Sequence, residues 1–385
     1  RELFAMPMCD QIPSKCIIIF SGFNPRAVVA FLRTLRKHDI KYAVIAKSKE
    51  DIIFLTDYKN KVMAVRETPE LDLDDILSAI KKIQKRIVAE QYVIAPTTEA
   101  LNRFVLNNRD VFRRHRCDIS LVEKSIYMLI SDKLSFSRLC RKNNIAIPKE
   151  QEFSFNMQLP AVAKPRQYFS AKGVPLSPYI LKNDVDLECF IKGNRLEDYY
   201  LQEYVEGRSF YLLYYFTKDG GIYKYSQENI VQQADGKSMV YAITSDFHFS
   251  EESYKYEVMF KKLGFHGLVM IEIRQRNGKN YMIEANPRFW GPSQLFVDSG
   301  CNLFEAWLYD NGFIRTPPEF KSNGNDIEYF WFGGLLQNYR QGKKLMFHKG
   351  KEIDLMKKLP TLLESDVYRR PDTMQLFIKE LSDEH

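Results

Sequence analysis

The sequence predicts a mixed α/β and α+β protein, with a parallel-sheet domain first, a β-rich region next and a helical region last. Three observations predict this order. Apolar strands alternate with amphipathic helices over residues 15–120, strands and turns dominate from residue 160, and helical patterns return from about Leu303. The 385 residues are enough for about two or three domains of ordinary size.

The composition is that of a globular protein without membrane spans. Hydrophobic residues make up 45% of the chain, and no apolar run approaches the ~20 residues that a transmembrane helix needs. The early run "CIIIF" is far too short, and no signal-peptide pattern precedes it. The six cysteines are scattered without a C-x-x-C pair: Cys9, Cys16, Cys117, Cys140, Cys189 and Cys301. This spacing favours a reducing, cytoplasmic location over a disulfide framework or a zinc site.

The charge balance favours anionic partners in general. The formal net charge is +7, which suits phosphates or nucleic acid. The basic residues are spread along the chain and form no block of like charge, so nucleic-acid binding rests on net charge alone and is disfavoured. Aromatic residues reach 14%, which suits large cores and stacking sites for a ring-bearing ligand.

The first part of the chain predicts a Rossmann-like parallel sheet. The strand candidates are "KCIIIF", "KYAVIAKS" and "QYVIAPTT", and the helices after them are "PRAVVAFLRTLRKHDI", "DILSAIKKIQKRIVAE" and "EALNRFVLNNRDVFRRH". Ligands on such sheets bind beyond the carboxyl ends of the strands, which places "SGFN" and "APTTE" at a ligand-facing edge. "SGFN" lacks the G-x-G-x-x-G pattern, so no dinucleotide site is predicted. Asn24, Arg26 and Glu99 are interpreted as ordinary loop and cap residues.

The middle of the chain predicts a helical stretch, "SIYMLISDKLSFSRLCRKNN", and then antiparallel strands. The strand candidates are "LPAVAKPR", "YILKN", "YYLQEYVEG", "SFYLLYYFTKDGGIYKYSQENIV", in which "KDGG" marks a hairpin turn, and "SMVYAITSDF". The helix "EESYKYEVMFKKLGF" follows. "HGLVMIEIRQRNGKNYMIEANP" then predicts a hairpin around "RNGK". The remainder is mainly helical and carries no motif with a recognisable function.

The last hairpin carries a cluster of oxygen ligands. Side chains alternate faces along a strand, so Met282, Glu284 and Asn286 are predicted to share one face. Pairing around the turn places Glu272 of the first strand beside them. Two carboxylates and an amide suit Mg²⁺ that shares its coordination shell with phosphates, and Arg288 is placed to hold a phosphoryl oxygen. The alternative is a surface hairpin with cross-strand charges, which either glutamate alone would favour.

Two lysines are candidates for contacts with phosphates. Lys164 lies in the apolar strand "AVAKPR", where a lysine is costly unless it is paired or faces a ligand. A structural and a functional interpretation of Lys164 weigh about equally. Lys133 lies in the helical "SDKLSF", and in isolation a solvated helix face explains it better.

These pieces, in this order, resemble the ATP-grasp superfamily of carboxylate–amine ligases. The order is a lysine on a helix, "VAKP" on a strand, the hinge "LQEYVEG", and then Glu…Glu-x-Asn-Pro-Arg. "IEANPRFWG" is especially similar to the closing motif of the group related to the large chain of carbamoyl-phosphate synthase. The resemblance implies a pre-ATP-grasp domain over residues 1–122, an ATP-grasp domain over residues 123–310, and a mainly helical region over residues 311–385. The small lobe would span about 125–203 and the large lobe about 204–310.

The resemblance also implies a role for each matching residue. Glu272, Glu284 and Asn286 would hold Mg²⁺, with Mn²⁺ as an alternative metal. Lys133 and Lys164 would contact the phosphates of ATP, and Lys164 and Arg288 would act in catalysis. The hinge residues Gln202, Glu203 and Val205 would bind the adenine edge, the first and last of them through backbone groups.

Two departures from the family pattern concern the nucleotide. The loop that covers the phosphates is usually rich in glycine, whereas "YFSAKGV" has only Gly173, so Ser170 and Lys172 are taken as its further contacts. An acidic residue commonly binds the ribose seven positions after the hinge begins, and here that position is Ser209. Glu206 or a neighbour is the alternative ribose ligand.

The function that the resemblance implies is an ATP-dependent, ADP-forming ligase. It would activate a small-molecule carboxylate as an acyl phosphate and join it to a small-molecule amine. The alternatives are an ATP-grasp enzyme with a carbamate, bicarbonate or thiol acceptor, and an ATP-binding module without catalysis. The identity of the substrates is not predicted, and a homodimer is left open.

Overall fold

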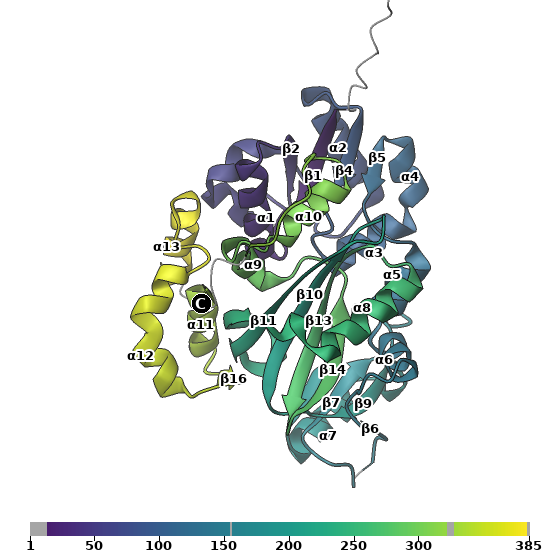
Figure 1. Cartoon of the computed structure of the whole chain (residues 1–385), viewed down its shortest axis with the longest axis vertical. Helices are drawn as coiled ribbons and strands as arrows, with labels where there is room; N and C mark the ends of the chain where they lie inside the picture. Colours follow the sequence, from purple (N-terminus) through teal and green to yellow (C-terminus); the bar gives the residue numbers. More distant parts are fainter. Residues whose placement is uncertain (1–13, 155, 322–326, 383–385) are drawn as a thin grey trace, which may run out of the picture.

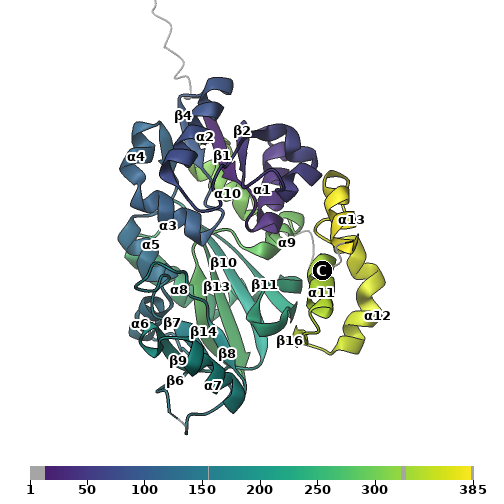
Figure 2. The same ribbon diagram turned by 180° about the vertical axis from the view of Figure 1, so that it is seen from behind.

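The computed structural model describes residues 14–154, 156–321 and 327–382, which three β-sheets organise (Figure 1). Residues 1–13, and with them Cys9, lie outside the described residues. The parallel sheet lies at one end of the molecule, the smallest sheet at the other and the largest sheet between them (Figures 1 and 2). The predicted α/β and α+β fold class is confirmed. None of the described helices is long and apolar enough to cross a membrane.

The first sheet has five parallel strands in the order β3-β2-β1-β4-β5. Its strands are β1 (Lys15–Phe20), β2 (Tyr42–Ala46), β3 (Val62–Val65), β4 (Gln91–Ile94) and β5 (Cys117–Ile119). Its helices are α1 (Pro25–Lys37), α2 (Leu73–Arg86), α3 (Glu99–Asn107) and α4 (Arg109–Arg114). α2, α3 and α4 bury their apolar faces in one core, and α1 buries its face in a second core on the opposite side. The short strands β3 and β5 were not predicted.

The smallest sheet has four antiparallel strands in the order β6-β9-β7-β8. The strands are β6 (Glu150–Gln151), β7 (Ala161–Pro165), β8 (Tyr179–Leu181) and β9 (Tyr199–Glu203). The helices near this sheet are α5 (Lys124–Ser131), α6 (Lys133–Lys142) and the unpredicted α7 (Asp184–Gly193). One helix was predicted where α5 and α6 form, and Asp132, with extended backbone, separates the two.

The largest sheet is antiparallel, in the order β14-β13-β10-β11-β12-β15, and β16 pairs with β11. The central strands are β10 (Arg208–Phe216), β11 (Ile222–Gln232), β12 (Met239–Ser245), β13 (Gly267–Arg276) and β14 (Lys279–Asn286). Helix α8 (Glu251–Leu263) packs against one face, and α9 (Gln294–Asp298) and α10 (Leu303–Asp310) pack against the other. Asn277 and Gly278 both have positive φ in the predicted hairpin between β13 and β14, as a two-residue Asn-Gly turn requires.

The C-terminal region is more closely joined to the large sheet than its mainly helical sequence predicts. Its helices are α11 (Phe332–Arg340), α12 (Glu352–Leu362) and α13 (Met374–Ser382), and they lie together along one side of the molecule (Figure 1). Two short strands, β15 (Glu328–Phe330) and β16 (Met346–Phe347), add to the edge of β12 and the end of β11. This connection brings the C-terminal region to the end of β11.

One sequence-based prediction about β14 is wrong. Met282 does not share a face with Glu284 and Asn286, because a β-bulge interrupts the pairing of β13 with β14. Glu272 pairs with Glu284, whereas Ile273 pairs with Met282, so Ile283 is the extra residue. Met282 consequently packs in the core on the α8 side of the sheet, and Glu284 faces the opposite side.

Candidate active site between the two antiparallel sheets

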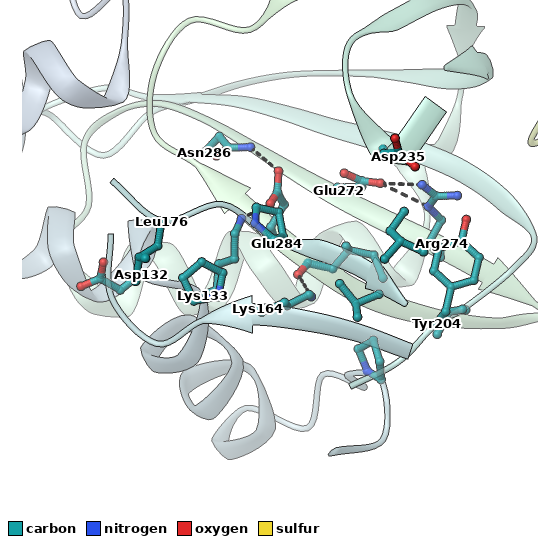
Figure 3. Close-up of a pocket in the computed structure, with 18 of the residues that line it drawn as sticks. Asp132, Lys133, Lys164, Leu176, Tyr204, Asp235, Glu272, Arg274, Glu284 and Asn286 are labelled. Atoms are coloured by element: carbon teal, nitrogen blue, oxygen red, sulfur yellow. Dashed lines mark hydrogen bonds and ion pairs between the residues drawn. The ribbon is translucent and has the colours of Figure 1, made fainter. Parts of the chain in front are cut away.

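A cavity of about 340 Å³ lies between the small antiparallel sheet and the large one (Figure 3). Residues of the small sheet, the hinge, the large sheet and the C-terminal region all contribute to its walls. It brings together six of the predicted metal, phosphate and catalytic residues, together with two hinge residues described below: Lys133, Lys164, Glu272, Glu284, Asn286 and Arg288. The first and the last of these six residues lie 155 positions apart in the sequence, so only the tertiary structure makes them neighbours.

The candidate metal ligands converge at one side of this cavity. Glu272 and Glu284 are direct partners in the β13–β14 ladder, and the amide Nδ2 of Asn286 donates to Oε1 of Glu284 at 2.8 Å (Figure 3). No group of three or more His, Cys, Asp or Glu able to hold a metal occurs within the described ranges. Two carboxylates and one amide nevertheless fit Mg²⁺, which keeps several coordination positions for phosphate and water. The donor set therefore suits a cation that arrives with a nucleotide.

The two lysines occupy the same side of the cavity in different ways. Lys133 is the first residue of α6 and forms an ion pair with Oε2 of Glu284. Lys164 is 4% exposed, and its Nζ donates to the carbonyl oxygen of Ile283, the bulged residue of β14, at 2.7 Å. The bulge thus turns a main-chain acceptor toward Lys164. Both ammonium groups lie beside the candidate metal ligands, where phosphate oxygens would meet them.

Burial and neighbouring charges set the protonation of this cluster. Burial, together with the Lys133 ammonium, lowers the pKa of Lys164 to about 7. Burial would raise the pKa of Glu284, but the Lys133 ammonium and its hydrogen bond outweigh it and lower that pKa to about 2. Burial raises the pKa of Glu272 against the opposing charge of Arg274. An anionic phosphate near Lys164 would favour the charged ammonium and strengthen binding.

Replacement of Lys164 by alanine is expected to weaken ATP far more than adenosine. A charge-assisted contact is worth roughly 1.5–3 kcal/mol. Adenosine has no phosphate, so it does not make this contact and its affinity should not depend on Lys164. The measurement is the dissociation constant of each ligand by calorimetry, with Lys149→Ala as a surface-lysine control. Equal weakening of both ligands would mean that Lys164 acts through packing.

The hinge contributes two of its three predicted residues to the cavity. Glu203 and Val205 line it together with Tyr204. The Glu203 carboxylate also accepts from the Lys149 backbone N–H and from Arg276, each at 3.1 Å. Gln202 is 1% exposed, and neither polar atom of its side chain has a hydrogen-bond partner in the described part of the chain. The role predicted for Gln202 is thus confined to its backbone.

Gly207 is the last residue of the hinge and allows the hinge backbone to pack closely against the large sheet. Its φ is 138°, and a Cβ there would lie 2.1 Å from the carbonyl oxygen of Gln275 on β13. Only glycine permits this approach of the hinge to the neighbouring strand. The hinge is therefore anchored at its end beside the cavity.

The tip of the predicted phosphate loop does not contribute to the cavity walls. Gly173 N–H donates to Ser170 O and Ser170 N–H to Val174 O, each at 2.9 Å, which folds the segment into a small hairpin. Lys172 and Gly173 are exposed at its tip, and the cavity walls contain Tyr168 and Leu176 from its base. Contacts of Ser170, Lys172 and Gly173 with a nucleotide would require the hairpin to close, as such loops do on substrate binding.

The structure places Ser209 outside the residues that form the cavity walls. Ser209 is fully buried on β10, and its hydroxyl accepts from Nδ2 of Asn229 on β11 at 3.0 Å. A direct contact of this hydroxyl with a ribose would require that hydrogen bond and the strand pairing to open. The predicted ribose contact thus has no support from this arrangement.

Sequence reasoning missed the cavity residues between β11 and the C-terminal region. Gln232, Asp235 and Met346 form this wall. The Asp235 carboxylate accepts from Lys182 of the small lobe at 3.2 Å and from Lys343 of the C-terminal region at 3.1 Å. No sequence motif marks these residues, because they become neighbours only through the pairing of β11 with β16.

The other end of the cavity carries charges of both signs. Glu99, Asp132 and Arg288 line it. The Arg103 guanidinium, whose side chain is 8% exposed, bridges Glu99 at 2.5 Å and Asp132 at 2.7 Å. Two carboxylates share one guanidinium, so these three side chains together carry a charge of −1, beside the positive charge of Arg288. The interpretation of Glu99 as a cap residue is therefore incomplete, because it also faces the cavity.

The loops predicted at the ligand-facing edge hold the two halves of the protein together. Nδ2 of Asn24 donates to the carbonyl oxygens of Thr97 and Phe289, each at 3.0 Å. The Arg26 guanidinium donates to Met239 O at 3.0 Å and stacks on Trp331 at 3.8 Å from the ring centroid. Asn24 and Arg26 are thus structural residues that dock the parallel sheet on "NPRFWG" and on the C-terminal region.

Several solved structures share this arrangement. A chain of Rhizobium etli pyruvate carboxylase is 16% identical over 81% of this chain, with a TM-score of 0.60, and this chain spans only 30% of its length. The biotin carboxylase domain of Hydrogenobacter thermophilus 2-oxoglutarate carboxylase, solved with MgADP, ADP and bicarbonate, is 15% identical with a TM-score of 0.58; the match covers 82% of this chain and 73% of that one. An L-amino acid ligase from Bacillus licheniformis is 12% identical with a TM-score of 0.56, over 81% of this chain and 78% of its own. No protein-family model and no curated protein sequence matches the chain.

Proposed function

Starting from the ATP-grasp fold, which this chain shares with those structures, we propose that it is an ATP-dependent, ADP-forming ligase that joins a carboxylate to an amine. One observation carries the proposal. Two carboxylates, an amide, two lysines and an arginine converge on one cavity although they come from distant parts of the sequence. A surface hairpin with cross-strand charges would not gather cations from α6 and β7 around the same carboxylates.

The proposed chemistry follows from the electronic properties of a carboxylate. A carboxylate is a poor electrophile, because its charge repels an amine and its leaving group would be oxide. Transfer of the γ-phosphoryl group from ATP to a carboxylate oxygen gives an acyl phosphate and ADP. The amine then attacks the acyl carbon, the bond to the phosphate oxygen breaks, and an amide and inorganic phosphate are released. No protein nucleophile is required, so catalysis consists of positioning and charge stabilisation.

The residues of the cavity fit the separate parts of this reaction. Lys133 and Lys164 would hold the phosphates of ATP, and Glu203 and Val205 would border the adenine. Arg288 would stabilise the transferring phosphoryl group. Glu272, Glu284 and Asn286 would hold Mg²⁺, which neutralises phosphate charge when it is bound.

The pair of carboxylates at the other end of the cavity favours an amine as the acceptor. Glu99, Asp132 and their shared Arg103 together carry a charge of −1, which attracts an ammonium group and repels bicarbonate. Arg288 beside them supplies the positive charge that a carboxylate needs. We therefore rank carbamate, bicarbonate and thiol acceptors below an amine.

An ATP-binding module without catalysis is the alternative from another class. Its support is the loop around Gly173, which has one glycine and lies open, and the burial of Ser209. ADP release with pooled amino acids, measured with and without Mg²⁺, distinguishes the two. A module without catalysis would bind ATP and release no ADP under either condition.

An ¹⁸O label in the carboxylate shows whether a carboxylate oxygen is transferred to the released phosphate. If the carboxylate is activated as an acyl phosphate, ¹⁸O placed in it is expected to appear in the released phosphate, because that oxygen leaves with phosphorus when the amine attacks. The products are expected to be ADP and phosphate, identified by ³¹P NMR and mass spectrometry. Release of pyrophosphate, or unlabelled phosphate during productive turnover, would exclude this mechanism.

A further inference from the structure

A polar network connects the C-terminal region to the candidate metal ligand Glu272. Arg274, two residues further along β13, donates to Oε1 of Glu272 through Nε at 3.2 Å and through Nη2 at 3.0 Å (Figure 3). Both side chains are less than one-tenth exposed, at 7% for Arg274 and 9% for Glu272. Both hydrogen bonds go to the same oxygen of Glu272, Oε1, so the other oxygen, Oε2, is not engaged by Arg274.

His348 of the C-terminal region holds the opposite side of this guanidinium. The Nη1 group of Arg274 lies 2.7 Å from Nδ1 of His348, and Nε2 of His348 lies 2.9 Å from Oε1 of Gln232. An arginine can only donate, so Nδ1 is the acceptor and the imidazole proton resides on Nε2, from which it is donated to Gln232. Burial, together with the neighbouring Arg274 charge, lowers the pKa of His348 to about 2, which keeps the ring neutral.

Main-chain pairing fixes His348 in this place. Its backbone N–H donates to the carbonyl oxygen of Ile230 at 2.9 Å, directly after Met346 and Phe347 pair with Gln232 and Val231. The Gln232 side chain is itself held, because its Nε2 donates to the carbonyl oxygen of Lys237 at 2.7 Å. The imidazole ring is therefore positioned by β16 and by Gln232, which lines the cavity.

We infer that His348 is a positioning residue, which acts through Arg274 to orient the Glu272 carboxylate for a divalent cation bound with the nucleotide. This inference rests on the proposed function of the cavity. Besides its two bonds to Glu272, the guanidinium reaches Oε1 of Gln232 through Nη2 at 3.4 Å, and its contact with His348 at 2.7 Å is the shortest of these. Residues that orient a metal ligand typically change metal affinity by about 10–100-fold when they are lost. The C-terminal region is then a functional part of the metal site.

Two substitutions at one position separate orientation from packing. Asparagine in place of His348 puts its amide oxygen near the position of Nδ1, so His348→Asn keeps an acceptor for Arg274. Glutamine reaches the position of Nε2, so His348→Gln keeps the contact with Gln232 and loses the acceptor. Lys349→Ala is the matched control, because it removes a contact of the same segment with the same sheet, the 3.2 Å ion pair with Glu228.

The experiment is calorimetric titration of each full-length variant with ADP, in the presence and absence of Mg²⁺. His348→Gln is expected to weaken MgADP about tenfold or more while metal-free ADP binds as it does to the wild type. His348→Asn is expected to stay close to the wild type, and Lys349→Ala to match it. Equal losses in His348→Asn and His348→Gln, or no loss in either, would overturn the inference.

A further variant and the wild type itself complete the test. Arg274→Lys is expected to weaken MgADP like His348→Gln, because one ammonium cannot bridge Glu272 and the imidazole. Wild-type affinity for MgADP in this variant, with unchanged circular dichroism, would contradict the role of the guanidinium. If the wild type bound no MgADP, the proposed function would fail and this inference with it. Binding by the wild type with unaffected variants would refute the inference alone.

Discussion

Replacement of Glu284 by glutamine is expected to reduce ATP turnover by at least about a hundredfold while the fold stays intact. Glu284 lies at the centre of the candidate metal site. It pairs with Glu272 in the strand ladder, forms an ion pair with the Lys133 ammonium, and accepts a hydrogen bond from the Asn286 amide at 2.8 Å. Glutamine keeps the shape but removes the charge that would hold a divalent cation, and a bound cation contributes several kcal/mol of charge stabilisation in phosphoryl transfer. The measurement is ADP release at saturating substrates over a range of Mg²⁺ concentrations.

The controls for this substitution separate the metal site from general ion pairing. Glu257→Gln removes the carboxylate of another Lys–Glu pair, 2.7 Å from Lys224, on the opposite side of the large sheet, and is expected to turn over ATP normally. Chelation of the metal with EDTA is expected to abolish the activity of the wild type, and added Mg²⁺ to restore it. Turnover like that of the wild type in Glu284→Gln would refute the metal assignment.

Replacement of Arg288 by alanine is expected to lower kcat by roughly 10²–10³-fold, the usual loss when one donor to a developing charge is removed. Arg288 lines the cavity beside Asn286, and its Nη1 donates to the carbonyl oxygen of Phe289 at 2.8 Å, which holds the guanidinium near the metal ligands. A contact that is made only in the transition state contributes nothing to holding substrate, so KM for ATP and for the carboxylate should change little.

Steady-state kinetics of Arg288→Ala test this division between kcat and KM. Arg288→Lys keeps the charge without the two-pronged geometry and is expected to fall between the wild type and Arg288→Ala. Arg141→Ala, which removes an exposed arginine paired with Glu150, is the surface control. A raised KM with an unchanged kcat would make Arg288 a substrate-binding residue and would refute its assigned role.

Local sequence determined the elements and most of their chemistry. Alternating apolar strands and amphipathic helices were enough to predict the parallel sheet, because side-chain burial follows the period of each element. The Asn-Gly turn predicted the β13–β14 hairpin, because a two-residue turn fixes the register of both strands. That register alone would pair Glu272 with Ile283, and the bulge is what pairs Glu272 with Glu284. The short strands β3 and β5 escaped prediction, since three or four residues carry too little periodicity.

The sequence by itself thus determined which residues could bind a metal and phosphates, and the tertiary structure decided which of them meet. Alternation placed Met282 and Glu284 on one face, but the bulge at Ile283 turns Glu284 to the opposite face and gives Lys164 its carbonyl partner. The network from His348 through Arg274 to Glu272 arises from the pairing of β16 with β11, across more than a hundred residues of chain. Such contacts leave no local signal, because a buried hydrogen bond between distant segments needs only one donor and one acceptor, and the fold alone brings them together.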